Sequence, residues 1–196
     1  MSAPPHIAFV YPHAGIGPEG QGIADALAVI LVELGRRLVE RGCAVTAFIR
    51  RRRGEPPASS LDGIAIRRIG QLPDHLLFRL RLLDRFRPAD RPLRVTSLYY
   101  PFFVRRVARA LARTGVDIVH LHNNACFVEP LRRRLADADL VLHQHDHALA
   151  DFAFDLTAAR LRRVNLLLTC SDHVRSRVVE RFPEIAPRAA TLWNGV

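Results

Sequence analysis

Two short apolar runs in the second half of the chain each end in a histidine-rich turn. The first reads Asp-Ile-Val-His-Leu-His-Asn-Asn over residues 117–124, and the second reads Leu-Val-Leu-His-Gln-His-Asp over residues 140–146. Runs rich in leucine and β-branched residues, separated by a helical segment, predict buried parallel strands of a βαβ unit. In open α/β sheets, ligands bind outside the carboxyl ends of the strands. The sequence therefore predicts that one sheet edge carries His120, His122, Asn123, His143, His145 and Asp146.

The same alternation of strands and helices runs through the whole chain. We expect strands at residues 6–11, 44–49, 64–69, 117–121, 139–144, 166–169 and 190–193. We expect helices at residues 23–41, 98–113, 127–135, 149–162 and 172–182. Residues 50–63 are expected to form a surface loop, and residues 75–87 fit a helix and a strand equally well. This alternation predicts an α/β fold with a doubly wound, mostly parallel sheet and helices on both faces.

Composition limits the class of protein and suggests an anionic partner. The chain has 196 residues and is 49% apolar, which suits one globular domain with a sizeable core. Its 29 basic residues are all arginine, and the formal net charge is +10. Such a charge favours a nucleotide, a phospholipid surface or a nucleic acid as partner, although a highly charged solvated exterior explains it equally well.

The cysteines and the N-terminus suggest a cytoplasmic location. Three cysteines, with no CxxC spacing, indicate neither a disulfide framework nor a zinc knuckle, and a reducing cytoplasm fits best. The first residues lack the layout of a signal peptide. The longest apolar run, residues 26–32, is far shorter than the roughly 20 residues that span a bilayer.

One helix raises the possibility of a contact at the inner face of the membrane. In the predicted helix 98–113, Arg105, Arg106, Arg109 and Arg113 lie opposite an apolar face. Such a helix could lie on an anionic membrane, with its tyrosines and phenylalanines at the interface. A helix with its apolar face in the core and its basic face in water is the alternative.

A glycine-rich loop follows the first predicted strand. Residues 12–22 contain Gly15, Gly17, Gly20 and Gly22, and the helix that follows would point its N-terminus at the same sheet edge. Free backbone N–H groups and a positive helix end suit a phosphate. The spacing matches neither the dinucleotide-binding GxGxxG motif nor a P-loop, so a plain tight turn remains an equal interpretation.

The histidines were weighed as metal ligands. The run His143-Gln-His145-Asp146-His147 is one residue shorter than the HxHxDH run of metallo-β-lactamase-like hydrolases. The missing residue would move the acid and the third histidine to the wrong faces, so we expect no metal site. There is no GxSxG motif for a serine nucleophile and no local pattern for a catalytic thiol.

Four stretches, taken in order, resemble the N-terminal half of a GT-B glycosyltransferase of family 4, a fold also found in glycogen and starch synthases. The resemblance spans essentially the whole chain. The stretches are Gly20-Gln-Gly22-Ile-Ala-Asp25, Leu38-Val-Glu-Arg-Gly42-Cys-Ala-Val45, Asp117-Ile-Val-His-Leu-His122, and Leu167-Leu-Thr-Cys-Ser171 with Trp193-Asn194-Gly195-Val196.

The resemblance implies a retaining, metal-independent transfer of a sugar, of hexosyltransferase type, from a nucleotide sugar to an acceptor. No cofactor is implied beyond the nucleotide-sugar substrate. His145 is implied as the catalytic residue, beside the reacting carbon of the donor sugar. His122, Asn123 and Asp146 would bind the acceptor, and Gly20 and Gly22 would approach the donor diphosphate.

The resemblance also bears on domain organisation and partners. We expect residues 1–196 to be a single Rossmann-like, acceptor-side N-terminal domain, because the chain ends where the family's nucleotide-sugar domain begins. Lacking that C-terminal domain, it should be inactive or nearly so alone. The acceptor is expected to be a sugar or a lipid-linked or phosphorylated molecule. A non-catalytic acceptor- or membrane-binding module is the alternative, and no motif of a nucleic-acid-binding module is present.

Overall fold

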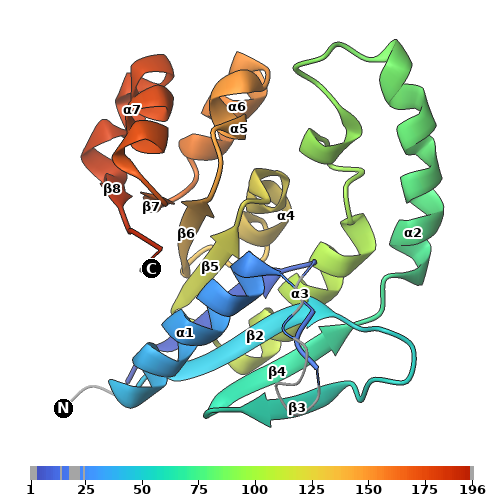
Figure 1. Ribbon diagram of the computed structural model, residues 1–196, viewed down its shortest axis with the longest axis vertical. Coiled ribbons are helices and arrows are strands. Elements are labelled where there is room, and N and C mark those ends of the chain that lie inside the picture. The colour runs from blue at the N-terminus through green and yellow to red at the C-terminus, as the bar shows by residue number, and fades with distance from the viewer. Residues whose placement is uncertain (1–3, 14, 18–22, 24, 195–196) are drawn as a thin grey trace.

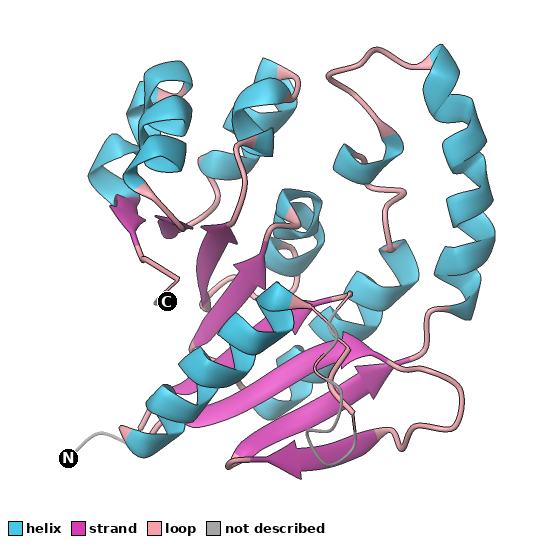
Figure 2. Cartoon of the chain, viewed as in Figure 1, coloured by secondary structure: helices cyan, strands magenta, loops and turns pink. Residues whose placement is uncertain are grey.

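The computed structural model shows an eight-stranded sheet with helices on both faces (Figures 1 and 2). It describes residues 4–13, 15–17, 23 and 25–194. The strand order is β3-β4-β2-β1-β5-β6-β7-β8, and each neighbouring pair is parallel except β3 and β4. The expected doubly wound, mostly parallel sheet is confirmed. The strands are β1 (His6–Tyr11), β2 (Ala44–Arg50), β3 (Ala58–Leu61), β4 (Ile64–Ile69), β5 (Ile118–His122), β6 (Asp139–Gln144), β7 (Leu166–Thr169) and β8 (Ala189–Thr191).

The helices divide between the two faces of the sheet. Helix α1 covers β1, β2 and β4 on one face, whereas α3, α4, α6 and α7 contribute to a larger core on the other (Figure 1). The α-helices are α1 (Ala26–Glu40), α2 (Leu72–Phe78), α3 (Pro101–Thr114), α4 (Val128–Arg132), α5 (Ala148–Asp151), α6 (Phe154–Leu161) and α7 (Asp172–Arg181). The 3-10 helices are η1 (Arg79–Phe86), η2 (Leu93–Val95), η3 (Ala125–Phe127) and η4 (Pro183–Arg188).

Each central strand contributes side chains to both cores, because its successive side chains point to opposite faces of the sheet. Phe9 of β1 lies in the core under α1, whereas its neighbours Ala8 and Val10 lie in the core on the opposite face. Successive side chains of a strand point to opposite faces, so a central strand covered on both sides is apolar throughout. Gly35 lets α1 approach β4 closely, because a Cβ there would lie 2.7 Å from Cδ1 of Ile64.

The expected loop at residues 50–63 contains an additional strand, β3, so that part of the prediction was wrong. β3 and β4 form an antiparallel hairpin whose turn residues, Asp62 and Gly63, have φ angles of 50° and 79°. Two successive residues with positive φ match the twist of a two-residue hairpin, and Asp-Gly is a favoured pair for that turn. The polar composition of β3 concealed a strand that lies at the edge of the sheet.

One predicted helix is divided in the structure, and the segment whose type was left open is helical. The helix predicted at 149–162 is two helices, α5 and α6, because the chain bends at Phe152 and Ala153, where Ala153 N donates to Asp90 O at 3.0 Å. The segment left open at 75–87 falls within α2 and η1, which form an arm that extends away from the sheet (Figure 1). Ser171 caps α7, since its hydroxyl accepts from Val174 N at 3.3 Å.

Helix α3 packs its apolar face into the core, which agrees with the interpretation of a core-facing helix whose basic face lies in water. Phe103, Val104 and Val107 are buried, and only Phe102 among the aromatic residues of α3 is exposed. The helix begins at Pro101, so Tyr99 and Tyr100 precede it instead of lying on it. Among the described residues, no helix is both long and apolar enough to cross a membrane.

The N-terminus of α3 is capped by a carboxylate from α2. Asp74 is 1% exposed, and its two oxygens accept from Phe102 N at 2.9 Å and Phe103 N at 3.0 Å. Tyr100, at the N-cap position, makes no capping hydrogen bond with its side chain. Asp74 therefore satisfies two N–H groups that would otherwise be buried without partners, and it joins the arm to α3. Burial raises the pKa of this carboxyl, against the opposing effect of the two N–H groups.

We expect Asp74→Ala to lower the free energy of unfolding by about 1–3 kcal/mol, because it leaves buried N–H groups of α3 unpaired. Urea denaturation followed by circular dichroism measures the change. Asp137→Ala, at an exposed position, is the matched control and should have little effect. Equal changes in the two variants would contradict the capping role.

Candidate functional site

The predicted site residues gather where the strand order reverses direction. The early strands β2 and β4 lie on one side of β1 in the sheet, and the later strands β5 to β8 lie on its other side. At such a switch point the connections diverge to opposite faces and leave a crevice beyond the carboxyl ends of the strands. His122 and Asn123 stand at the end of β5, and His145 follows β6. The expectation that these residues lie at one sheet edge is confirmed.

His122 and His145 are joined by a direct hydrogen bond between their rings. Nδ1 of His122 lies 3.0 Å from Nε2 of His145. The ring planes differ by only 8°, and the centroids are 5.2 Å apart. This is the geometry of two coplanar imidazoles that meet edge to edge, with one ring donating and the other accepting. The protonation of each ring is therefore linked to that of the other.

Asn123 holds the backbone on either side of this pair. It has a φ of 61°, in the left-handed region that asparagine tolerates better than most residues. Its N–H donates to His143 O at 2.9 Å, and its side-chain Oδ1 accepts from His145 N at 2.8 Å. The side chain that was predicted to bind an acceptor thus also fixes the position of His145 in the structure.

Asp146 begins the turn that leads into α5. One carboxylate oxygen, Oδ1, accepts from Gln144 Nε2 at 2.7 Å and from Ala148 N at 2.9 Å. The residue is exposed and lines a small cavity at the sheet edge. Its position leaves it open to a ligand in that cavity.

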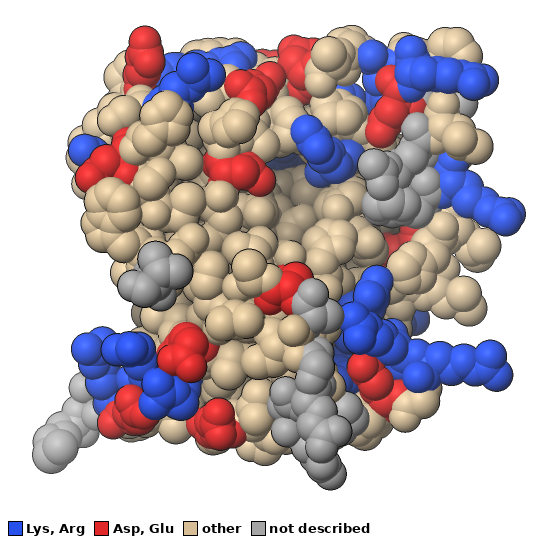
Figure 3. All heavy atoms as spheres, in the orientation of Figure 1, with Lys and Arg blue, Asp and Glu red and all other residues tan. Residues whose placement is uncertain are grey.

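The cavity has a volume of about 190 Å³ and lies over the ends of the central strands. Figure 3 shows the molecule hollowed in this region, with a basic side chain at the rim. Asn123 and Asp146 line it, but His122 and His145 do not: His122 is fully buried beneath it and His145 is half-buried. Other walls come from Tyr11, His13, Arg94 and Tyr99.

His13 and Tyr99 are wall residues that the sequence analysis did not select. Nε2 of His13 lies 2.8 Å from the hydroxyl of Tyr99, which pins the turn after β1 to the segment before α3. Burial lowers the pKa of His13, and the positive charge of Arg50 adds to that effect. A signal for His13 existed, because it follows the carboxyl end of the central strand. The pairing with Tyr99 spans 86 residues and has no local signature.

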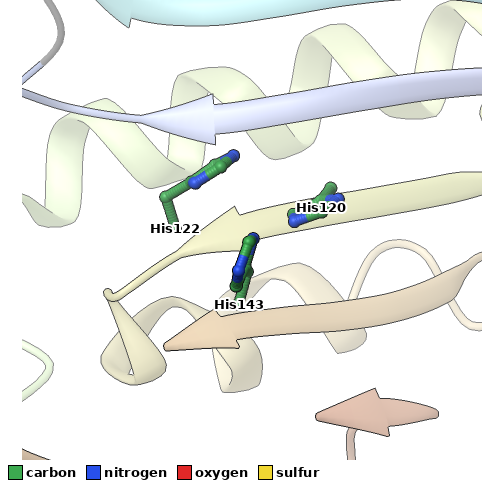
Figure 4. Close-up of side chains that lie close together, drawn as sticks. All are labelled: His120, His122 and His143. Carbon is green, nitrogen blue, oxygen red and sulfur yellow. The ribbon is translucent and has the colours of Figure 1, made fainter. Parts of the chain in front are cut away.

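Below the cavity, the histidines form a buried cluster on the α1 side of the sheet. His120, His122 and His143 project from β5 and β6 onto the same face (Figure 4). Burial lowers the pKa of His120 to about 3, of His143 to about 2 and of His145 to about 4. The pKa of His122 is also far below its ordinary value, for the same reason. All four imidazoles are therefore neutral near pH 7.

The three buried histidines of this cluster also offer the donor atoms of a metal site. His120, His122 and His143 each offer a ring nitrogen, and these nitrogens lie within 4.8 Å of one another. Imidazoles are common zinc ligands, so the donor atoms are suitable. The group itself contains no carboxylate, however, so the three imidazoles would leave the charge of a divalent ion unbalanced within the group. These residues therefore provide a metal's ligands without its charge balance.

The glycine loop is described only in part. Gly20 and Gly22, the predicted diphosphate contacts, lie outside the described residues. The preceding residues are held by Arg68, a buried guanidinium that donates to Ile16 O at 2.9 Å and to Gly17 O at 3.2 Å. After the loop, Asp25 caps α1 by accepting from Ala28 N at 2.9 Å. The described residues on either side of the loop are thus held by hydrogen bonds.

Burial keeps one of the three cysteines unreactive. All three are free thiols. Burial raises the pKa of Cys126 to about 12, so this thiol stays protonated and unreactive. Cys170 donates from Sγ to His145 O at 3.4 Å and so supports the turn after β6.

The chain was compared with known proteins. The family model for Glycosyltransferase Family 4 matches residues 27–196, which is most of the chain. Two curated proteins of Bacillus subtilis (strain 168) are similar over about half of it. Spore coat protein SA is 26% identical over 95 residues, or 46% of this chain and 24% of that protein. The protein named "Putative glycosyltransferase YtcC" is 24% identical over 92 residues, or 46% of this chain and 23% of that protein.

A solved structure has a similar fold. Sucrose-phosphate synthase from Thermosynechococcus elongatus superposes with a TM-score of 0.66 and 16% sequence identity, covering 96% of this chain and 48% of that one. At this identity the likeness establishes the fold alone. The chain spans about a quarter of the length of the curated relatives and about half of the synthase.

Buried neutral histidines make a specific prediction about acid stability. The ordinary histidine pKa is 6.5, and the folded-state pKa of His145 is about 4. Since all four folded-state values are lowered, unfolding takes up protons as the pH falls below 6.5. The free energy of unfolding should therefore be highest above pH 6.5 and fall between pH 6.5 and 4, by up to about 1.4 kcal/mol per pH unit for each histidine.

Urea denaturation at a series of pH values measures this slope. His120→Phe should reduce it by about the contribution of one histidine, because the ring it removes is buried beside Phe9. His173→Phe, at an exposed position on α7, is the matched control. A slope that is the same in the wild type and in His120→Phe would show that the buried imidazoles do not set the acid stability.

Proposed function

The chain belongs to glycosyltransferase family 4, and from this premise we propose that it forms the acceptor-side half of a glycosyltransferase active site. The reaction would move a sugar from a nucleotide sugar to an acceptor, with retention of configuration and without a bound metal. The observation that carries the proposal is the His122–His145 pair, held by Asn123 at the switch point of the sheet. His145 would border the reacting carbon of the donor sugar.

A neutral imidazole suits that position. Glycosyl transfer passes through a transition state in which positive charge develops on the sugar ring, as in glycoside hydrolysis. A protonated histidine beside that ring would oppose the charge, whereas a neutral ring would not. Burial lowers the pKa of His145 to about 4, against the opposing effects of Asp146 and Asn194, and so favours the neutral ring near pH 7.

The acceptor would occupy the cavity over the strand ends. Asp146 there offers a carboxylate to an acceptor hydroxyl, and Arg94 offers an exposed guanidinium to a negatively charged group. Arg94 also lies over the ring of Phe152, 5.1 Å from its centroid, so one wall joins a cation to an apolar surface. These contacts favour a phosphorylated or lipid-linked sugar as acceptor.

The donor would require contacts from outside this chain. Gly20 and Gly22 are proposed to approach the donor diphosphate, with a C-terminal nucleotide-sugar domain supplying the opposite wall of the cleft. A transfer reaction needs both substrates held in one geometry, which a single wall does not provide. The isolated chain should therefore have little or no activity.

A second candidate is a non-catalytic module that binds an acceptor or an anionic membrane. The arm favours it, because the apolar side chains of Leu72, Leu82 and Phe86 are each more than 70% exposed there, at 74%, 74% and 73%. Exposed arginines lie between them, including Arg79 and Arg85. Apolar side chains interleaved with cationic ones suit contact with an anionic bilayer.

We expect sugar transfer from a nucleotide sugar only in the longest form encoded by the reading frame of this chain, and little or none from residues 1–196 alone. His145→Ala in that longer form should lower kcat about 100-fold, because it removes a group placed against the reacting sugar. His173→Ala is the control at an exposed position. Transfer should persist in EDTA, and the product's anomeric configuration should match that of the donor.

The outcomes separate the two candidates. Transfer that survives His145→Ala would remove this residue from the active site, and loss of activity in EDTA with recovery on adding zinc would overturn metal independence. No turnover in either form would favour the binding module.

Asn123 should act as a positioning residue for His145. Asn123→Gly keeps the positive φ but loses the oxygen that accepts from His145 N, so we expect kcat to fall about tenfold with little change in the KM of the nucleotide sugar. Asn123→Asp retains an accepting oxygen and should recover most of the activity. If Asn123→Asp is as impaired as Asn123→Gly, the hydrogen bond to His145 is not what matters.

A further inference from the structure

A second, larger cavity is lined by residues of α3, α4 and α6. Its volume is about 1100 Å³, compared with about 190 Å³ for the acceptor cavity. One wall is formed by residues 87–97, the segment by which the chain returns from the arm (Figure 1). The other three walls come from α3, from α4 with the residues that follow it, and from α6. Its size is that of a pocket for a substantial ligand.

Arginines from two of these walls line the cavity. Arg105 and Arg109 stand one turn apart on α3, and both are exposed. Arg87 and Arg91 come from the returning segment. Within the described part of the chain, neither Arg105 nor Arg109 forms an ion pair. Their charges are therefore free to meet a ligand.

The other two walls add further positive charge. Arg133 and Arg134 follow α4, and Arg160 and Arg163 lie on or just beyond α6. The only acidic residue in the described lining is Glu129, which pairs with Arg133 at 3.0 Å and also with Arg163. Eight arginines thus share one concave surface whose described lining contains a single carboxylate, and one of the eight, Arg91, also pairs with Asp155 outside that lining at 2.6 Å.

Such an arrangement differs from an arginine-rich exterior in general. Like charges repel, and a concave surface brings them closer together than a convex one, so the potential inside is strongly positive. Guanidinium groups form paired, charge-assisted hydrogen bonds with phosphate oxygens. One phosphate group would meet only part of a cavity of about 1100 Å³ whose arginines come from four walls.

We propose that this arginine cavity binds a ligand carrying several phosphate groups, at a site distinct from the acceptor cavity. The ligand is either a soluble polyphosphorylated molecule or a group of phosphomonoester lipid headgroups, which share this chemistry. It would hold the returning segment of residues 87–97 against α3 and α6.

The two cavities share a wall. Arg160 and Cys126 line both of them, and Arg160 donates a hydrogen bond to Val95 O in the returning segment. Val95 and Arg94 also line the acceptor cavity. A ligand that fixes the returning segment would therefore fix part of the acceptor wall. Binding itself does not depend on the proposed glycosyltransferase activity, so the two proposals fail separately.

Isothermal titration with inorganic tripolyphosphate and with inositol hexakisphosphate tests the proposal on the full 196-residue chain. We expect saturable binding that raises the melting temperature. Arg105→Gln/Arg109→Gln should weaken it at least tenfold, because both arginines lack other partners. Arg67→Gln/Arg113→Gln removes the same charge from exposed positions outside the cavity and should retain affinity.

A second arm identifies the source of the phosphates. Vesicles of phosphatidylcholine and phosphatidic acid are tested by co-sedimentation with both double variants. Vesicle binding that Arg105→Gln/Arg109→Gln abolishes and tripolyphosphate displaces would support lipid headgroups, and binding of the soluble probes alone would support a soluble ligand. Equal loss of affinity in the two double variants, or no binding of any probe, would overturn the proposal.

Discussion

The burial of four neutral imidazoles, complete or nearly so for three and partial for His145, is the constraint on which the rest of the site depends. A charged histidine would be costly at this depth, so each ring must stay neutral, as the lowered pKa values of His120, His143 and His145 indicate. A neutral imidazole has one donor and one acceptor nitrogen, and the coplanar contact of His122 with His145 uses one of each. Because His122 is fully buried, it cannot turn away without leaving that nitrogen unpaired, and His145 inherits its fixed orientation.

The parallel strands make this arrangement possible. His122 of β5 pairs in register with His143 of β6, so the two strands end side by side and their next residues share one turn region. Asn123 then bridges the strands, with its N–H on His143 O and its side chain on His145 N. Two hydrogen bonds, His122 to His145 and Asn123 to His145, thus join residues that are more than 20 positions apart in the chain. Parallel pairing brings the ends of β5 and β6 together, and the hydrogen bonds of Asn123 fix the position of His145.

Much of the fold could be predicted from the sequence because central parallel strands are apolar on both faces. β1, β6 and β7 have the expected bounds for that reason, and β4 has them although its sequence, Ile-Ala-Ile-Arg-Arg-Ile, is not apolar throughout. Edge strand β3 was missed because its sequence, Ala-Ser-Ser-Leu, is neither apolar nor alternating, and only Asp62 and Gly63 mark the hairpin. The division between α5 and α6 depends on a backbone contact with Asp90, which no local pattern reveals. The strand-end histidines were predictable from periodicity, whereas the depth of His122 and the pairing of His13 with Tyr99 follow from tertiary packing.

The strand-end histidines and the arginine cavity differ in charge and are therefore suited to different chemistry. Where a sugar carbon would gain positive charge, the chain places histidines that burial keeps neutral. Where anions would bind, it places arginines, which keep their charge at any physiological pH. A histidine in the arginine cavity would lose its proton beside so many cations and bind phosphate poorly, and an arginine in place of His145 would bring a permanent charge to the reacting centre. The net charge of +10 therefore says less about function than the positions of the charged side chains do. Only the folded chain shows that arginines gather in one cavity and neutral histidines beneath the other.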